Sequence, residues 1–140
     1  MENEKPKVGL GVMIFKDDKV LMGKRKGSHG EGEYAFPGGH VEHLESFETC
    51  ARRETLEECR IEIKNIKFQF LANVTAYAPK HYVHIGLTAE YASGDLKVME
   101  PEKCESWDWY NIESLPEPMF AMCVLAFKAL KSGDNYYDGK

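Results

Sequence analysis

Three glutamates carry the strongest chemical signal in this sequence. Glu54, Glu57 and Glu58 are spaced at i, i+3 and i+4, so a helix would place all three on one face. Like charges at these spacings repel one another, and removing them from water costs several kcal/mol. A divalent cation with hard oxygen ligands is the simplest compensation, and it is the preceding Gly-Gly turn and the inward placement of the acids, not their spacing alone, that favour a metal site. The alternative is a solvated helix in which the acids pair with neighbouring arginines.

The residues around these acids predict a helix over about residues 46–59, preceded by a Pro-Gly-Gly turn. Ser46 is the expected N-cap. At about 100° per residue, Phe47, Cys50 and Ala51 lie within about 100° of one another and form an apolar stripe. We expect this stripe to anchor the upper turns to the core, while the acids project from the turns below.

Strand-like patterns lie on both sides of this helix. Before it, apolar and β-branched residues at 8–15 and 20–25 predict a hairpin, and 34–36 a short strand. After it, 66–77 and 81–91 predict a second hairpin, and 106–110 a short strand. Apolar residues at helical spacing predict a last helix over 119–131, with a face made of Phe120, Cys123, Val124, Phe127 and Leu130. The tail from residue 133 is expected to be loose.

Composition bounds the class of protein. The chain has 140 residues, 43% hydrophobic and 29% charged, which indicates one domain over residues 1–140 with an ordered core at about 7–131. A net charge of -5 argues against a general nucleic-acid binder but allows a small anionic ligand held by a local basic cluster. No long apolar run or signal peptide is present, and the four cysteines are scattered. We therefore expect a cytoplasmic protein with reduced thiols, without a membrane partner.

The segment that begins at Gly39 resembles the Nudix box, G-x5-E-x7-R-E-U-x-E-E-x-G-U, in which U is a bulky apolar residue. The positions in register are Gly39, Glu45, Arg53, Glu54, Glu57, Glu58 and Ile61. Thr55 stands where an apolar residue is expected, and Arg60 stands where glycine would supply a left-handed helix cap. The segments GKRKGS (23–28), FPGGHVE (36–42) and EPEKCESWDW (100–109) are similar to the MutT-like nucleoside triphosphate diphosphatases. The resemblance covers about residues 7–131.

This resemblance implies an α/β fold, the Nudix α/β/α sandwich, with a mixed central sheet flanked by the Nudix helix and a C-terminal helix. It also implies Mg²⁺, or Mn²⁺ as a substitute, held by Glu54, Glu57 and Glu58 and by the backbone at Gly38 and Gly39. Mg²⁺ keeps several waters, so a few carboxylates together with substrate phosphates suit it. Arg53 is expected to pair with Glu45 and Glu57 and so to hold the acids in place.

The remaining site residues are expected on the loops around the helix. Glu102 is the first candidate for the catalytic base, ahead of Glu100 and Glu105, and the alternative for each is a solvated loop acid. Lys24 and Arg25 are either an exposed basic edge or a phosphate clamp, and the resemblance favours the clamp at Arg25.

Residues that would contact the base are also predicted. His40 is expected beside the substrate, on the resemblance. An aromatic wall for the base is expected from Phe36, Tyr82, Trp107, Met119 and Phe120, with core packing as the alternative. The other histidines, His29, His43, His81 and His84, show no ligand spacing, and we interpret them as having no role in the site.

The function that follows from the resemblance is Mg²⁺-dependent hydrolysis of nucleoside triphosphates to nucleoside monophosphate and pyrophosphate. Water would attack the β-phosphorus, and modified or oxidised purine nucleotides are the favoured substrates. The alternatives are hydrolysis of another nucleoside diphosphate linked to a group X, and a non-catalytic module that senses a nucleotide. The family pattern further implies a homodimer, a small nucleotide substrate and no nucleic-acid polymer as partner.

Overall fold

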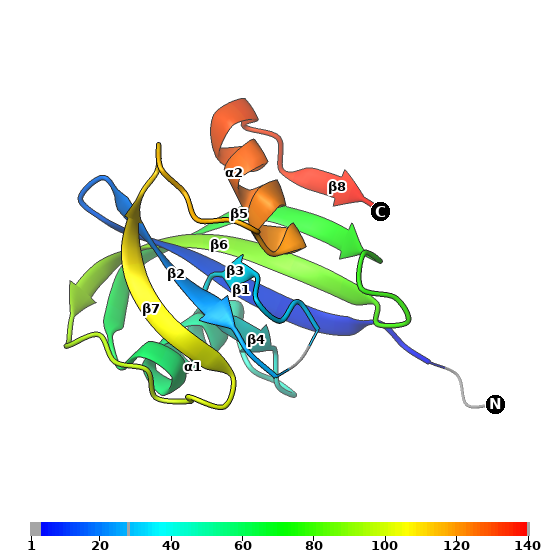
Figure 1. The fold of residues 1–140 in the computed structure, drawn as a ribbon. Coiled ribbons are helices and arrows are strands. Elements are labelled where there is room, and N and C mark those ends of the chain that lie inside the picture. The colour runs from blue at the N-terminus through cyan, green and yellow to red at the C-terminus, as the bar shows by residue number, and fades with distance from the viewer. Residues whose placement is uncertain (1–3, 28, 140) are drawn as a thin grey trace.

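The protein folds into a mixed β-sheet with one helix on each face (Figure 1). The computed structural model describes residues 4–27 and 29–139. Ser28 of the GKRKGS segment lies outside these residues, as do positions 1–3 and 140 of the predicted domain. The strands are β1 (Lys7–Lys16), β2 (Lys19–Arg25), β3 (Tyr34–Ala35), β4 (Gly38–His40), β5 (Glu62–Val74), β6 (Tyr82–Ser93), β7 (Cys104–Asn111) and β8 (Tyr136–Asp138). The helices are α1 (Phe47–Cys59) and α2 (Ala121–Ser132).

The sheet is built around the parallel pair of β1 and β6. Its order is β3-β2-β1-β6-β5-β8, while β4 pairs with β1 and β7 pairs with β2. The two predicted hairpins are confirmed, because β1 pairs antiparallel with β2 and β5 pairs antiparallel with β6. The β5–β8 pair is parallel, so the mixed sheet expected from the sequence is present.

Alternation along β1 divides the core between the two helices. Leu10, Val12 and Ile14 point to one face and pack with Cys50 and other residues of α1. Met13 points to the opposite face and belongs to the cluster that contains the buried side of α2. The sheet therefore separates an α1 side from an α2 side, which is the predicted sandwich.

Helix α1 begins and ends with local caps. The Ser46 hydroxyl accepts a hydrogen bond from the backbone N–H of Thr49 at 3.0 Å, as expected for an N-cap. Arg60 adopts the left-handed conformation at φ 64°, and its N–H donates to the carbonyl of Leu56 at 3.1 Å. The helix thus forms the cap that glycine usually supplies, without glycine.

Two predictions about buried helix faces are wrong. Phe47 is 47% exposed, whereas Cys50, Ala51, Thr55 and Cys59 form the buried stripe of α1. Phe47 lies one turn before Ala51 on the same i, i+4 row, but it is the first residue of α1, and the buried stripe begins only at Cys50.

In α2 the buried residues are Met122, Cys123, Ala126 and Ala129. Val124 and Leu130 of the predicted face are exposed. Close packing on the sheet selects the small alanines at this contact.

The carboxyl-terminal tail is a strand, so the expectation of a loose tail is wrong. Leu71 of β5 pairs with Tyr136 of β8, and the Leu71 N–H donates to the carbonyl of Asn135 at 2.9 Å. The Asn73 amide also donates to the Asp138 carboxylate at 3.0 Å. The tail thus covers the open edge of β5, which would otherwise present unpaired backbone groups.

Candidate active site

A cavity of about 1020 Å³ crosses the molecule beside β1 and is the setting for the predicted site residues. Glu54 and Glu58 line it from α1, and Gly9 and Gly11 line it from β1. Phe120 lines it from the α2 side. A site of this size accommodates a whole nucleotide, because ligand pockets usually hold about 300–1,000 Å³.

Two glycines allow the acids of α1 to approach the sheet. The predicted turn at these positions is instead strand β4, in which Gly38 pairs with Gly11 and Gly39 with Leu10. A Cβ atom on Gly39 would collide with the Glu54 carboxylate. A Cβ atom on Gly38 would collide with the backbone carbonyl of Leu10. Each position therefore needs glycine because of close approach.

The paired carboxylates strongly influence each other. Burial raises the pKa of Glu58 well above its usual range, and the hydrogen bond and charge of neighbouring Glu54 raise it further. The backbone N–H of Gly38 opposes this rise by donating to the Glu58 carboxylate. The pKa of Glu54 is also raised, chiefly by burial. Two close carboxylates that are costly to ionise together form a site whose charge a cation would neutralise.

This donor set fits a cation that keeps part of its hydration. Within residues 4–27 and 29–139, no group of three or more His, Cys, Asp or Glu side chains is placed to hold a metal ion. Glu54 and Glu58 would therefore supply the carboxylate ligands, with water and substrate phosphates completing the shell. Mg²⁺ is usually coordinated in this way, by a few carboxylates with water and phosphate, and seldom by a closed cage of protein ligands.

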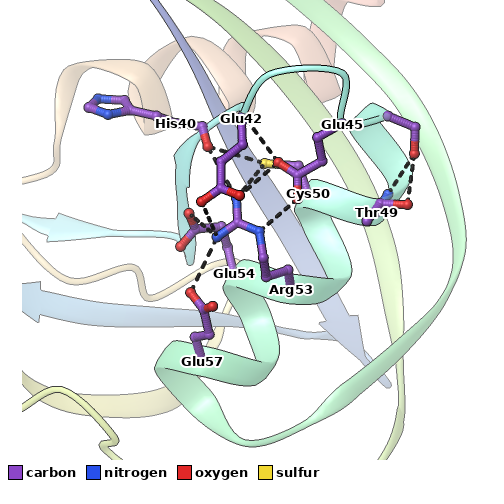
Figure 2. A network of polar contacts seen from close by, with 9 residues as sticks. His40, Glu42, Glu45, Thr49, Cys50, Arg53, Glu54 and Glu57 are labelled. Carbon is purple, nitrogen blue, oxygen red and sulfur yellow. Dashed lines mark hydrogen bonds and ion pairs between the residues drawn. The ribbon is translucent and has the colours of Figure 1, made fainter.

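Arg53 organises the acids around it, as Figure 2 shows. Its Nε and Nη2 donate to the two Glu45 oxygens at 2.6 and 3.0 Å, and its Nη1 donates to Glu54 at 3.1 Å. Its Nη1 also reaches Glu57 at 3.3 Å, and its Nη2 donates to the His40 carbonyl at 3.2 Å. The predicted pairing of Arg53 with Glu45 and Glu57 is therefore present. It orients Glu54 from behind, as outer partners of a metal ligand do.

The same network lowers the pKa of Glu45 and holds the Glu57 side chain outside the cavity. The Arg53 hydrogen bond, aided by the Glu42 backbone N–H, lowers the pKa of Glu45 to about 2. Glu57 does not line the cavity, and its side chain is 52% exposed and directed to Arg53. The structure therefore brings Glu54 and Glu58 together in the cavity and leaves Glu57 on its outer side.

A loop after β6 brings further acids to the same end of the cavity. The N–H of Met99 donates to the Glu58 carbonyl at 3.2 Å, which ties this loop to the end of α1. Glu100 and Glu102 both line the cavity, whereas Glu105 does not. The charge of Glu100 also helps to raise the pKa of Glu58, and Glu100 and Glu102 both stay candidates for the base.

One of the two predicted phosphate-binding residues faces the cavity. Arg25 lines it, with its guanidinium 4.2 Å from the centroid of the Phe120 ring. Lys24 does not line the cavity, because side chains alternate along β2 and Lys24 is paired with Tyr34 of β3. Lys26 and other cations that the sequence did not single out also line it, namely Lys7, Lys80 and Lys103.

The aromatic wall is present with one exchange. Phe36, Tyr82, Trp107 and Phe120 line the cavity, whereas Met122 lines it in place of the predicted Met119. His40 also lines it, and its ring stacks on Tyr82 with centroids 5.8 Å apart.

Two histidines interpreted as having no role also line the cavity. His29 stacks on Tyr82 with centroids 5.7 Å apart, and burial together with Arg25 and Lys80 lowers its pKa to about 4. His84 is buried on β6. The only sequence signal for His84 was its i+2 spacing from Tyr82, which puts the two side chains on one face of the strand.

Comparison with known proteins agrees with this geometry. The NUDIX domain family profile matches residues 5–125. The chain is 33% identical over 106 residues to the NAD-capped RNA hydrolase NudC of Edwardsiella ictaluri (strain 93-146), a match covering 76% of this chain and 39% of that protein. NudC of Pseudomonas entomophila (strain L48) is 34% identical over 105 residues, which cover 75% of this chain and 36% of the relative. The chain thus spans less than half the length of these relatives.

A solved structure extends the likeness to nearly the whole chain. The MutT NUDIX hydrolase from Burkholderia pseudomallei matches with a TM-score of 0.84 and 31% identity, covering 89% of this chain and 98% of that one. The chain therefore belongs to the NUDIX family and is a Nudix hydrolase. The fold and the family predicted from the sequence are both confirmed. No helix within the described residues is long and apolar enough to cross a membrane.

Proposed function

We propose that this chain hydrolyses nucleoside triphosphates to nucleoside monophosphate and pyrophosphate with Mg²⁺, and that modified or oxidised purine nucleotides are its preferred substrates. One observation carries the proposal. The paired carboxylates of Glu54 and Glu58 share a single cavity with an aromatic wall that reaches the α2 side of the sheet. A nucleotide has the same division, because its phosphates need cations and its planar base needs aromatic surface.

The residues of the cavity divide the work accordingly. Mg²⁺ bound at Glu54 and Glu58 would polarise the phosphates and activate water, and Mn²⁺ is expected to replace it because it takes the same oxygen ligands. Arg25 is placed to neutralise phosphate charge by charge-assisted hydrogen bonds. Arg53 fixes the Glu54 carboxylate. Glu102, which lines the cavity, would accept a proton from the attacking water, with Glu100 as the alternative.

A second candidate is hydrolysis of a nucleoside diphosphate linked to a group X. The first support is the name of the NudC relatives, which are NAD-capped RNA hydrolases. The second is a groove of about 400 Å³ that shares Lys7, Lys80 and Tyr82 with the main cavity and also contains Lys5. Such a basic groove would give X a place outside the cavity. RNA is part of the substrate named for these relatives. A nucleic-acid polymer is therefore a candidate substrate here, contrary to the expectation from the sequence.

A substrate panel tests both candidates. Nucleoside triphosphates, oxidised purine triphosphates, NAD and a short NAD-capped RNA are incubated with Mg²⁺, and the products are separated by chromatography. If the triphosphate proposal is right, wild type releases monophosphate and pyrophosphate. Glu58→Gln, which lacks one proposed metal ligand, should be slower by about a hundredfold or more. Turnover of NAD or capped RNA alone would favour the second candidate. Tight binding without turnover of any compound would instead identify a sensing module. The homodimer stays a prediction, which light scattering measures.

A further inference from the structure

His84 is a buried polar side chain that the proposed chemistry does not use. It lies on β6, is 8% exposed, and lines the cavity. Within residues 4–27 and 29–139, no side-chain hydrogen bond of His84 is formed, and its ring packs against Phe70 with centroids 5.6 Å apart. Buried polar groups in folded proteins nearly always have hydrogen-bond partners. Since the protein provides none here, the partner is expected to come from the cavity.

Strand β1 approaches this ring closely. Gly9 is in register with His84 in the parallel β1–β6 pair, and Gly11 follows two residues later on the same face. A Cβ atom on Gly11 would lie 3.1 Å from Cε1 and 3.2 Å from Nε2 of His84. A Cβ atom on Gly9 would lie 3.8 Å from Nδ1. The two glycines therefore let the imidazole lie directly against the backbone of β1, and Gly9, Gly11 and His84 all line the cavity.

The surroundings of His84 suit a planar ring. Tyr82, two residues earlier on β6, belongs to the core cluster on the α2 side of the sheet, and alternation places His84 on the same side. Phe120 and Met122 line the cavity on that side. Glu54 and Glu58, by contrast, project from α1 on the other side. A nucleotide whose phosphates lie at these carboxylates would therefore extend its base toward His84.

We propose that His84 is a base-recognition residue, which hydrogen-bonds the edge of a purine base bound against the aromatic wall of the cavity. This inference rests on the proposed function, because it assumes that the cavity binds a nucleotide. His84 is a binding residue and touches none of the reacting phosphates.

The state of the imidazole sets which bases it accepts. Burial lowers the pKa of His84 to about 4, so the ring is neutral at pH 7. A neutral imidazole has one donor and one acceptor nitrogen, and the choice of tautomer follows the hydrogen bonds available. His84 can therefore donate to the bare N7 of an ordinary purine or accept from the N7–H of an oxidised one. The subsite would thus bind both forms.

Nuclear magnetic resonance tests the contact in the wild-type protein without requiring turnover. Protein with ¹⁵N-labelled histidine is titrated with a purine nucleoside monophosphate and, separately, with ribose 5-phosphate. The expected result is a shift of the His84 ring nitrogens with the nucleotide and no comparable shift with ribose 5-phosphate. Unmoved His84 signals at saturating nucleotide, or a failure of any nucleotide to bind, would overturn the inference.

Calorimetry with three variants measures the contribution of the contact. His84→Leu should bind a non-hydrolysable purine triphosphate analogue about tenfold more weakly, the usual effect of one lost neutral hydrogen bond. His84→Gln, which keeps a donor and an acceptor, should recover most of the affinity. His43→Leu, which removes an exposed imidazole that does not line the cavity, should bind as wild type.

The two experiments separate this inference from the proposed function. Turnover by wild type with unshifted His84 signals and wild-type affinity in His84→Leu would reject the role of His84 and leave the hydrolase proposal standing. Nucleotide binding with shifted His84 signals but no turnover of any substrate would do the reverse.

Discussion

Replacing Glu58 by glutamine should remove the response of this protein to Mg²⁺. The substitution keeps the shape of the side chain and removes one of the two carboxylates of α1 that line the cavity. A ligand at 100 times its dissociation constant stabilises a folded protein by about 2.7 kcal/mol. For a domain of this size, that energy corresponds to a rise of roughly 5 to 10 °C in Tm. Wild type should show this rise with Mg²⁺ in a thermal melt, and Glu58→Gln should lose most of it.

The pH dependence gives this prediction a second part. In the metal-free protein the pKa of Glu58 is raised above its unfolded value, so the folded state binds the proton more tightly than the unfolded state. Metal-free stability should therefore fall as pH rises from the ordinary glutamate pKa toward the raised one. Mg²⁺ binds the deprotonated pair, so the increase in Tm caused by Mg²⁺ should grow over the same pH range.

The chain offers a matched control one residue earlier. Glu57 is half-exposed, pairs with Arg53 and does not line the cavity. Glu57→Gln should therefore keep most of the Mg²⁺-dependent rise in Tm and lose less activity than Glu58→Gln. The reasoning would be refuted if Glu57→Gln lost the rise and Glu58→Gln kept it. An absence of any rise in wild type would support a salt-bridged helix without metal.

Three further outcomes are expected. Gly39→Ala should fold but lose Mg²⁺ stabilisation, because its methyl group displaces the flexible Glu54 carboxylate. Gly38→Ala should lower Tm even without metal, because its methyl group collides with the backbone of β1. Thermal melts with and without Mg²⁺ distinguish the two variants. Arg53→Lys should lose the two-pronged contact with Glu45, whose pKa is held at about 2. Wild type gains stability from Glu45 above the ordinary glutamate pKa and loses it as pH falls toward 2, and acid titration of the variant should show a smaller loss. Deletion of β8 should lower Tm and increase aggregation, because it exposes the edge of β5.

The helix that carries the acids was predictable because its signals are local. Ser46 precedes an apolar period of helical spacing, and the glutamates follow at i, i+3 and i+4. The exposure of Phe47 was not predictable from residue type, since an aromatic residue in the first turn can face either the sheet or solvent. That choice depends on where the sheet lies relative to the helix.

Two short strands, β4 and β8, could not be predicted from the sequence. Residues 38–40 and 136–138 contain glycine, tyrosine and polar residues, which favour turns as readily as strands. Both segments become strands because a partner edge is available, β1 for the first and β5 for the second. Tertiary pairing decided these elements, and local propensity did not.

The acidic half of the site was predictable from local sequence, whereas the half on the α2 side depends on tertiary pairing. The acidic half lies in one contiguous segment, so spacing alone brought Glu54 and Glu58 together. The half on the α2 side is assembled from separate strands and loops, and His84 joins it only because β6 pairs with β1 next to two glycines. A histidine at alternate spacing from Tyr82 faces the core as often as a cavity, and the sequence cannot tell which.

The glycines of the neighbouring strands explain how one sheet serves both halves. Gly11 of β1 pairs directly with Gly38 of β4, and Leu10 between the β1 glycines pairs with Gly39. Strands normally fill such positions with β-branched side chains, so glycines at this contact cost stability and need a compensating reason. On the α1 side Gly39 admits the Glu54 carboxylate, and on the α2 side Gly9 and Gly11 admit the His84 ring. The same lack of side chains thus lets the Glu54 carboxylate and the His84 ring approach neighbouring strands from opposite faces of the sheet, and both residues line one cavity.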